Sequence, residues 1–232
     1  MNAPIRALPS VARPAHIAED EWALRLELAA CYRLFAHLGW TEMIFNHITL
    51  RVPGPESHFL INPYGLHYTE VTARNLVKID VHGQVIGESA WPVNPAGFVI
   101  HAAIHEHRAD AHCVIHTHTT AGIAVACKQG GLRHDNFYSA QFFGRVAYHD
   151  FEGVTTDLAE QERLVASLGN ADALILRNHG LLVVGPTIPE SVLRAIPNQQ
   201  KAMRAGHVRP YQPVFDAMLR VAGIRLEDLA GE

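Results

Sequence analysis

Short apolar runs separated by glycine- and proline-containing turns fill the middle of the chain, and they constrain its fold more than any other feature. The runs have the length and composition of β-strands, and segments with helical periodicity precede and follow them. Strands are expected over residues 44–52, 58–62, 76–81, 85–86, 113–118, 173–176 and 181–184. Because some runs are joined by short turns and others by crossovers, the pattern predicts a mixed sheet covered by helices.

Helical periodicity is clearest over residues 19–40, where Leu24, Leu28, Cys31 and Phe35 recur at steps of four and three residues. Further helices are expected over residues 98–107 with Pro95 in the first turn, over 121–127, over 156–168 with Thr156 or Asp157 as the cap, and from 189 onward with breaks at Pro197, Pro210 and Pro213. Residues 138–148 fit neither a helix nor a strand clearly.

The bulk composition indicates an ordinary globular protein. The 232 residues suit one domain over residues 19–232, preceded by a flexible segment over 1–18 that contains three prolines. A formal charge of -4 with scattered basic residues argues against nucleic acid as a partner, and no apolar stretch is long enough for a membrane span. Three cysteines without CxxC spacing fit a reducing compartment, so a cytoplasmic location is expected. Arg6 and Arg13, with no acidic residue before Glu19, leave an organellar transit peptide as the alternative.

Histidine is the compositional exception, with 16 residues against 19 lysines and arginines. His116 and His118 alternate in an apolar strand, so both imidazoles leave the same face, with α-carbons about 6.6 Å apart. That separation suits two ligands of one metal ion. His179 lies in a polar interruption between two apolar runs, and it is the best donor for a third ligand. Cys113 has the opposite parity and His112 lies about 13 Å from His116 along the strand, so both are excluded.

Two other interpretations of these histidines stay open. A His-x-His pair in a strand also occurs on a polar sheet face, although two buried imidazoles without partners would carry a desolvation penalty. His101 and His105 are four residues apart on a helix, which is the spacing of another metal pair. Without a third ligand nearby, packing or support of the first site is favoured for them.

Several motifs resemble the class II aldolase and adducin family when they are taken together. They span Trp22 to Pro189 and cover residues 45–49, 61–65, 96–105, 109–110, 113–119 and 178–182. The resemblance implies a three-layer α/β/α fold with a mostly antiparallel sheet, a homotetramer with sites near subunit boundaries, and zinc on His116, His118 and His179. Manganese is the alternative metal. In such enzymes the ion polarises a small hydroxy-carbonyl substrate for carbon–carbon cleavage or decarboxylation.

The chain departs from the sugar-phosphate aldolases of this family at positions that bear on the reaction. The resemblance matches Asn46 and Gly65 to substrate-binding positions and makes Tyr138 a candidate for the aromatic group that reaches a neighbouring subunit. The family's acid/base glutamate, however, is matched by Gly97, and its phosphate-binding serines by Pro95 and Ala96. The sequence therefore predicts neither a phosphorylated substrate nor the identity of the acid/base.

Three functions are compatible with these residues. The first is a metal-dependent lyase that cleaves a carbon–carbon bond in a small hydroxy-carbonyl substrate. The second is a non-catalytic binding or scaffolding domain that resembles the adducin head and retains its metal site. The third is metal-assisted hydrolysis. Retention of all three histidines favours an enzyme, whereas Gly97 favours the scaffold.

Overall fold

The computed structural model describes residues 13–153, 159–195 and 211–231 of the chain. Seven strands within these residues form one sheet in the order β3-β2-β1-β4-β7-β6-β5. Neighbouring strands are antiparallel except β5 and β6, which run parallel. The predicted mixed, mostly antiparallel sheet is therefore confirmed.

Most of the described elements follow the order expected from the sequence, whereas β5 and the 3-10 turns were not assigned there. The strands are β1 (His47–Arg51), β2 (Phe59–Ile61), β3 (Val77–Ile79), β4 (Cys113–Thr117), β5 (Val146–His149), β6 (Ala173–Leu176) and β7 (Gly180–Gly185). The α-helices are α1 (Glu19–His37), α2 (Pro95–His107), α3 (Thr120–Ala126), α4 (Glu160–Leu168), α5 (Ile188–Ala195) and α6 (Tyr211–Val221). Short 3-10 turns are η1 (Tyr68–Glu70), η2 (Ser139–Phe142) and η5 (Leu226–Leu229).

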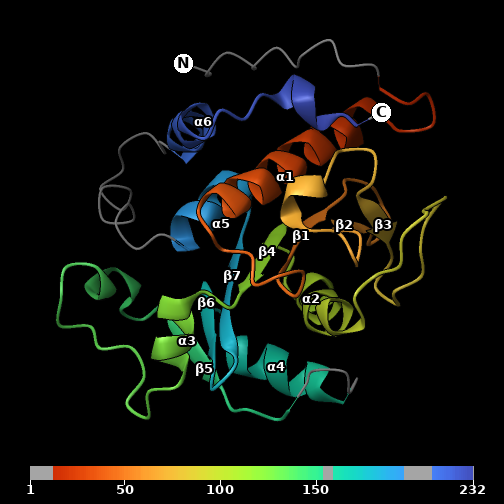
Figure 1. Ribbon diagram of the computed structural model, residues 1–232. Helices are drawn as coiled ribbons and strands as arrows, with labels where there is room; N and C mark the ends of the chain where they lie inside the picture. Colours follow the sequence, from red (N-terminus) through yellow and green to blue (C-terminus); the bar gives the residue numbers. More distant parts are fainter. Residues whose placement is uncertain (1–12, 154–158, 196–210, 232) are drawn as a thin grey trace.

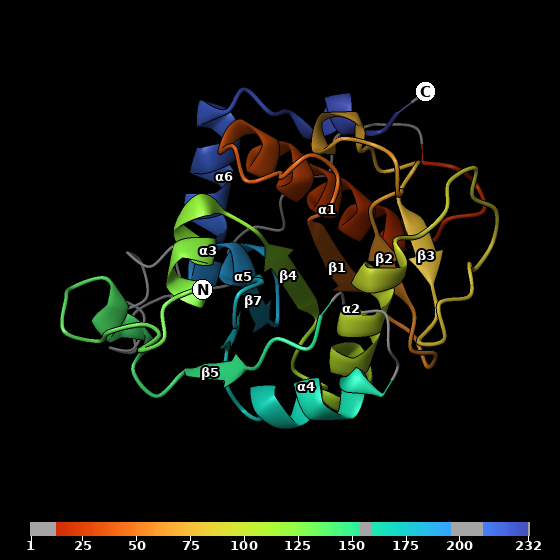
Figure 2. The ribbon, with the colours of Figure 1, turned by 60° about the horizontal axis from the view of Figure 1, so that its bottom comes forward.

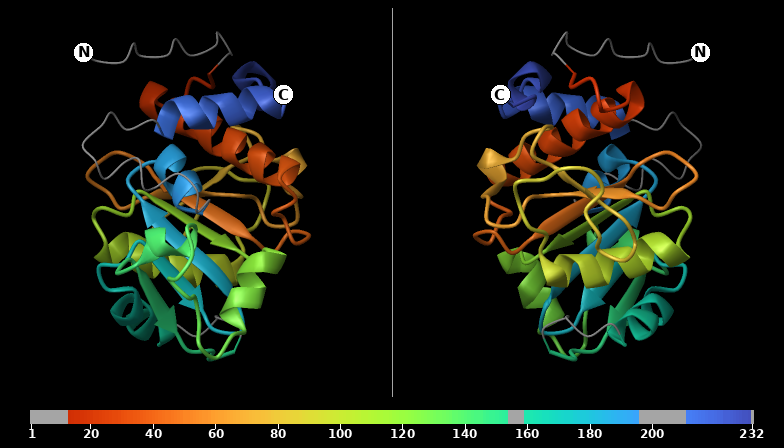
Figure 3. Two further views of the ribbon diagram at one scale, coloured as in Figure 1. Left: turned by 90° about the vertical axis from the view of Figure 1, so that its left-hand side faces the viewer. Right: turned by 90° about the vertical axis from the view of Figure 1, so that its right-hand side faces the viewer.

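Helices cover both faces of the sheet and give three layers (Figures 1 and 3). On one face, Ile48 and Leu50 of β1 pack into a core with residues of α1, α5 and α6. On the other face, Ile100 of α2 and Leu164 of α4 pack against β4, β6 and β7. Figure 2 shows β5 at one edge of the sheet, close to α4. The expected α/β/α arrangement is confirmed.

Strand alternation decides which residues of β1 reach the α2 side. Because Ile48 and Leu50 face α1, His47 and Thr49 face α2. His47 is also paired with His116 across the ladder between β1 and β4. The sheet therefore places polar residues from two neighbouring strands side by side beneath α2.

Several predicted boundaries were wrong. Residues 85–86 form no strand, because only a single bridge joins Val85 to Ile79. The ambiguous stretch 138–148 divides into the turn η2 and most of strand β5. Pro213 lies in the first turn of α6, where a missing N–H costs no hydrogen bond, so it does not interrupt that helix.

Other predictions concern residues outside the described part of the chain. Thr156 and Asp157 lie there, and α4 is preceded by Ala159, which makes no side-chain cap. Pro197 and Pro210 also lie there, as does most of the predicted flexible segment 1–18. A single domain over residues 19–232 stays a prediction.

Among the described helices, none combines the length and hydropathy that crossing a bilayer requires.

Candidate metal centre

Three histidines from two parts of the chain meet at the end of the sheet. His116 lies in β4, His118 follows it, and His179 lies in the turn that leads from β6 into β7. One ring nitrogen from each lies within 4.8 Å of the others, and the ring centroids are 4.6–5.0 Å apart. Neither Cys113 nor His112 belongs to this group of described residues. The structure thus brings together the three residues that the sequence predicts as ligands.

Hydrogen bonds at Nδ1 orient the first two rings. Nδ1 of His116 lies 3.0 Å from the carbonyl oxygen of Leu181, which can only accept, so this nitrogen carries the proton. Nδ1 of His118 donates to the carboxylate of Glu42. The two Nε2 atoms face each other at 2.8 Å with their lone pairs available. Carbonyl and carboxylate partners of this kind commonly fix the tautomer of metal-binding histidines.

The turn before β7 places His179 beside this pair. Asn178 adopts the left-handed backbone conformation with φ 55°, and its N–H donates to the carbonyl of Ala126 at 3.1 Å. Gly180 then lies directly against His118: a Cβ at this position would be 2.7 Å from Cδ2 of His118 and 2.7 Å from the carbonyl oxygen of Thr117. The absence of a side chain at Gly180 is therefore what allows β7 to approach so closely.

The charge state of these imidazoles also suits a metal ion. Burial lowers the pKa of His116 well below its usual value, and neighbouring imidazoles lower it further. Burial, followed by the charge of His118, lowers the pKa of His179 to about 4. Both rings are neutral at neutral pH, as metal binding requires. Nitrogens around a tetrahedral zinc ion lie about 3.4 Å apart, so a small rotation of the rings accommodates the ion.

The other predicted site residues have different surroundings. Asn46 is buried; its Oδ1 accepts from the backbone N–H of His118 at 3.0 Å, and its Nδ2 donates to the carbonyl of Trp40 at 3.2 Å. Gly65 lies in a turn with φ 105°. Tyr138 is 53% exposed, and its ring contacts Phe137. Among the described contacts, none joins Gly65 or Tyr138 to the three histidines.

His47 is a neighbour of the site that the sequence alone did not identify. Its ring centroid lies 4.8 Å from that of His116, and its Nδ1 lies 2.9 Å from Nε2 of His101. A Cβ at Gly97 would lie 3.0 Å from Cγ and Cδ2 of His47, so the space that a side chain at residue 97 requires is filled by this imidazole. His47 and Thr49 alternate in the strand and therefore face the same side of the sheet. This pattern would have pointed to His47 only if the pairing of β1 with β4 had been known.

Another buried histidine lies at the end of β5. Nδ1 of His149 is 3.0 Å from the hydroxyl of Ser167, and its Nε2 is 3.4 Å from a carboxylate oxygen of Glu160. His149 and Glu160 are each 5% exposed. The charge of His149 also contributes to the low pKa of His179. A positive charge on His149 would therefore oppose protonation of the third predicted ligand.

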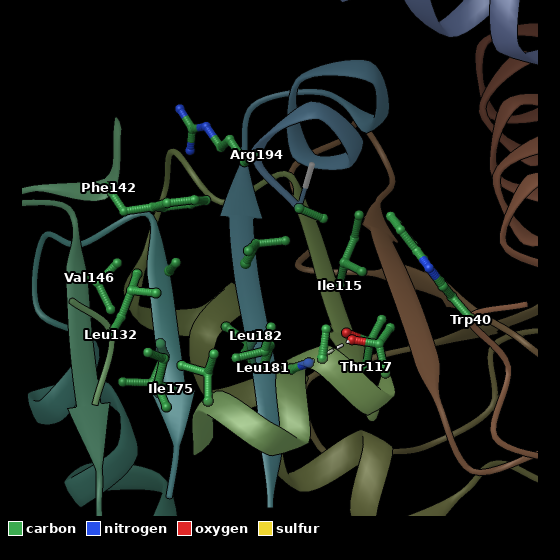
Figure 4. Close-up of a pocket in the computed structure, with 18 of the residues that line it drawn as sticks. Trp40, Ile115, Thr117, Leu132, Phe142, Val146, Ile175, Leu181, Leu182 and Arg194 are labelled. Atoms are coloured by element: carbon green, nitrogen blue, oxygen red, sulfur yellow. Dashed lines mark hydrogen bonds between the residues drawn. The ribbon is translucent and has the colours of Figure 1, made fainter. Parts of the chain in front are cut away.

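A cavity lies on the opposite side of the sheet from His116. It has a volume of about 520 Å³ and is lined by Ile115 and Thr117, which alternate with His116 in β4 (Figure 4). Most of its wall is apolar, including Leu181, with Arg194 at one end. Arg194 is already paired with Asp172 and Glu190. His116 and its polar neighbours therefore lie on the other face of the sheet, which α2 covers.

Comparisons with known proteins agree with this arrangement. The family model described as Class II Aldolase and Adducin N-terminal domain matches residues 26–202. A Caulobacter vibrioides protein, whose name places it provisionally among class 2 aldolases, is 47% identical over 206 residues, which cover 86% of this chain and 80% of that protein. Alpha-adducin of Rattus norvegicus is 45% identical over 176 residues, which cover 75% of this chain and 24% of adducin. The structure of an L-fuculose 1-phosphate aldolase from Glaciozyma antarctica matches with a TM-score of 0.74 and 28% identity, covering 95% of this chain and 97% of that one.

Proposed function

Because this chain belongs to the class II aldolase and adducin family, we propose that it is a metal-dependent lyase that cleaves a carbon–carbon bond in a small hydroxy-carbonyl substrate, by aldol cleavage or by decarboxylation. The observation that carries the proposal is the meeting of three histidine nitrogens, two of which have their lone pairs directed at each other by hydrogen bonds at Nδ1. Three neutral imidazoles are a usual protein contribution to a catalytic zinc site.

The residues of this chain would each have a defined part. His116, His118 and His179 would hold the ion, which we propose to be zinc, with manganese as the alternative. Such an ion, when bound, supplies Lewis-acid polarisation of a carbonyl oxygen. Glu42 and the carbonyl of Leu181 hold two of the rings in the correct tautomer.

Asn46 and Gly65 are proposed to contact the substrate. For Asn46 the structure adds a second role, because its side chain joins the backbone of His118 to that of Trp40. An asparagine tied in this way can hold the His118 segment in place while its remaining amide proton stays available to a substrate.

A non-catalytic scaffold is the second proposal, and two observations favour it. Alpha-adducin is 45% identical to this chain over the matched region, and the position of the family's glutamate is occupied by Gly97. In that case the three histidines would hold an ion that only stabilises the fold. The two proposals differ in one measurable property, which is turnover.

Metal analysis of the purified protein, followed by assays of aldehyde, pyruvate and carbon dioxide release, separates these proposals. We expect one divalent ion per chain and turnover that a chelator removes. His116→Ala should lose the ion and all turnover, whereas His112→Ala, at an exposed position outside the cluster, should keep both. Bound ion without turnover on any carbonyl substrate would favour the scaffold. Turnover that survives His116→Ala would contradict the metal mechanism.

We also propose that the protein is a homotetramer, located in the cytoplasm. Exposed aromatic side chains around η2 support a subunit contact, because Phe137, Tyr138 and Phe143 are 63%, 53% and 72% exposed. Sedimentation velocity should give a species four times the mass of the chain, and replacing Phe143 by serine should weaken the assembly. A stable monomer at micromolar concentration would contradict this proposal.

A further inference from the structure

A line of buried hydrogen bonds runs from the end of α2 to His47. Nδ1 of His105 lies 3.0 Å from the carbonyl oxygen of Ala111, and Nε2 of His105 lies 2.7 Å from the hydroxyl of Thr49. The same hydroxyl lies 2.6 Å from Nδ1 of His101, whose Nε2 lies 2.9 Å from Nδ1 of His47. These three histidines and Thr49 are at most 2% exposed.

The carbonyl at the end of this line determines the direction of every hydrogen bond. The Ala111 oxygen can only accept, so His105 carries its proton on Nδ1. Burial lowers the pKa of His105 to about 3, so the ring is neutral and its Nε2 accepts from the Thr49 hydroxyl. With its one proton used, that hydroxyl accepts from Nδ1 of His101.

The same reasoning continues to the metal centre. A neutral His101 has a bare Nε2, which must accept from Nδ1 of His47. His101 and His47 are both buried, and among the described contacts neither ring meets a carboxylate that would hold a second proton. Nε2 of His47 is then unprotonated, and no other described residue provides it with a hydrogen-bond partner.

His47 lies between α2 and the three histidines. Its Nδ1 is directed at α2, and its Cγ and Cδ2 atoms lie against Gly97. His116 is its direct neighbour across the β1–β4 ladder, and the centroids of the two rings lie 4.8 Å apart. His47 is not one of the three clustered histidines, so it lies beside the proposed ligands without being one of them.

We propose that this hydrogen-bond line fixes His47 as an acceptor beside the three histidines, where Nε2 accepts a hydrogen bond from a hydroxyl group of the substrate. The inference rests on the proposed metal-dependent function and adds to it a residue that recognises the hydroxyl group of the substrate. In this arrangement His47 occupies the space beside Gly97, and Thr49, His101 and His105 are positioning residues that act through it.

Two hydroxamates that differ by a single hydroxyl group test the substrate contact. Acetohydroxamate and glycolohydroxamate both chelate zinc, and only the second carries the hydroxyl. Calorimetry on the zinc-loaded protein should show about a fivefold to tenfold preference for glycolohydroxamate, the usual effect of one hydrogen bond. His47→Asn keeps a donor toward His101 but has no acceptor at the Nε2 position, so the preference should disappear. His47→Gln places an amide oxygen near that position and should keep it.

The positioning residues have their own matched pair. Thr49→Val removes the hydroxyl that connects His101 to His105 and should reduce the preference, whereas Thr49→Ser should retain it. Zinc content is measured for every variant, so a lost ion is distinguished from a lost hydroxyl contact. Nitrogen-15 spectra of histidine-labelled, zinc-loaded protein provide a readout that does not depend on ligand binding. His47, His101 and His105 should each carry the proton on Nδ1, with the His47 signal assigned through its absence in His47→Asn.

Each outcome has a clear meaning. A proton on Nε2 of His47, or the same hydroxamate preference in the wild type and in His47→Asn, would overturn the inference while leaving the metal site intact. Failure of the wild type to hold zinc, or to bind either hydroxamate, would contradict the proposed function. In that case nitrogen-15 spectra of the metal-free protein still decide the His47 tautomer.

Discussion

The backbone at Gly180 lies against the imidazole of His118 and the carbonyl oxygen of Thr117. Gly180→Ala would place a methyl group 2.7 Å from atoms of both residues, and the carbonyl cannot move without disturbing β4. We expect His118 to be displaced and zinc affinity to fall at least about tenfold, as when ligand orientation is lost. Competition with a chelating dye measures this affinity. Gly130→Ala is the control, since nothing lies within 4 Å of its Cβ; equal affinities in the two variants would disprove the close contact.

Residue-level prediction succeeded where the chemistry depended on local spacing. His116 and His118 were predicted from strand alternation, and the structure brings them together with His179. Glu42 was missed because it lies in a loop, with φ 38°, and a loop sequence contains no periodicity that would direct its carboxylate toward His118. His47 was missed because its importance arises from pairing with β4, and single-strand patterns do not specify which strands are neighbours.

At the scale of elements, α1 is held to the sheet by an ion-pair network as well as by its apolar face. Glu21 is 7% exposed and pairs with Arg25 and Lys78, each at 2.8 Å, and Arg25 also donates to the carbonyl of Leu76. Burial raises the pKa of Glu21, but its bonds to Lys78 and Arg25 outweigh this effect, so the pKa lies below the usual value. The network therefore stabilises the fold whenever Glu21 is ionised.

Glu21→Gln should lower the free energy of unfolding by about 2–3 kcal/mol at pH 7, because Arg25 is left buried with a weaker partner. Since the folded pKa of Glu21 is depressed, its contribution is present above the unfolded pKa and is lost as the pH falls through the folded value. Urea denaturation at pH 7 and pH 3 measures both effects. Glu227→Gln, which breaks an exposed pair with Arg225, is the control and should change the stability far less. A similar loss in both variants would contradict a special role for the buried network.

Element-level prediction was most reliable for the longest periodic segments. Helix α1 and strands β4, β6 and β7 lie where the pattern placed them, because each has a regular apolar face or a continuous apolar run. Strand β5 was ambiguous, since it pairs with only one neighbour and three of its four residues are half-buried. A strand at a sheet edge needs fewer apolar side chains, so its sequence carries a weaker signal.

In the whole molecule, the two faces of the sheet have different chemistry. The face covered by α1, α5 and α6 has an apolar core, whereas the face beneath α2 buries His47, Thr49, His101, His105 and His116. Each buried imidazole is neutral in the folded state but accepts a proton readily when the chain unfolds. The side of the molecule that carries the proposed site should therefore also make the fold sensitive to acid.

His105 makes this sensitivity measurable without involving a metal ligand. Burial, aided by the charge of Arg51, lowers its pKa to about 3, although its bond to the Ala111 carbonyl opposes the shift. The unfolded value is about 6.5, so between these limits the unfolded chain binds a proton that the folded protein excludes. Stability should then fall with decreasing pH by about 1.4 kcal/mol per pH unit from this residue alone.

Urea denaturation of metal-free protein between pH 6 and pH 4.5 should show this slope, increased further by His47, His101 and His116, whose pKa values shift in the same direction. His105→Gln should reduce the slope by about 1.4 kcal/mol per pH unit, whatever its effect on stability at pH 7.5. His37→Gln, at the exposed end of α1, should leave the slope unchanged. If His105→Gln retained the full slope, the pKa of His105 would not be lowered in the folded protein. The direction of the hydrogen bonds from Ala111 to His47 would then no longer be fixed.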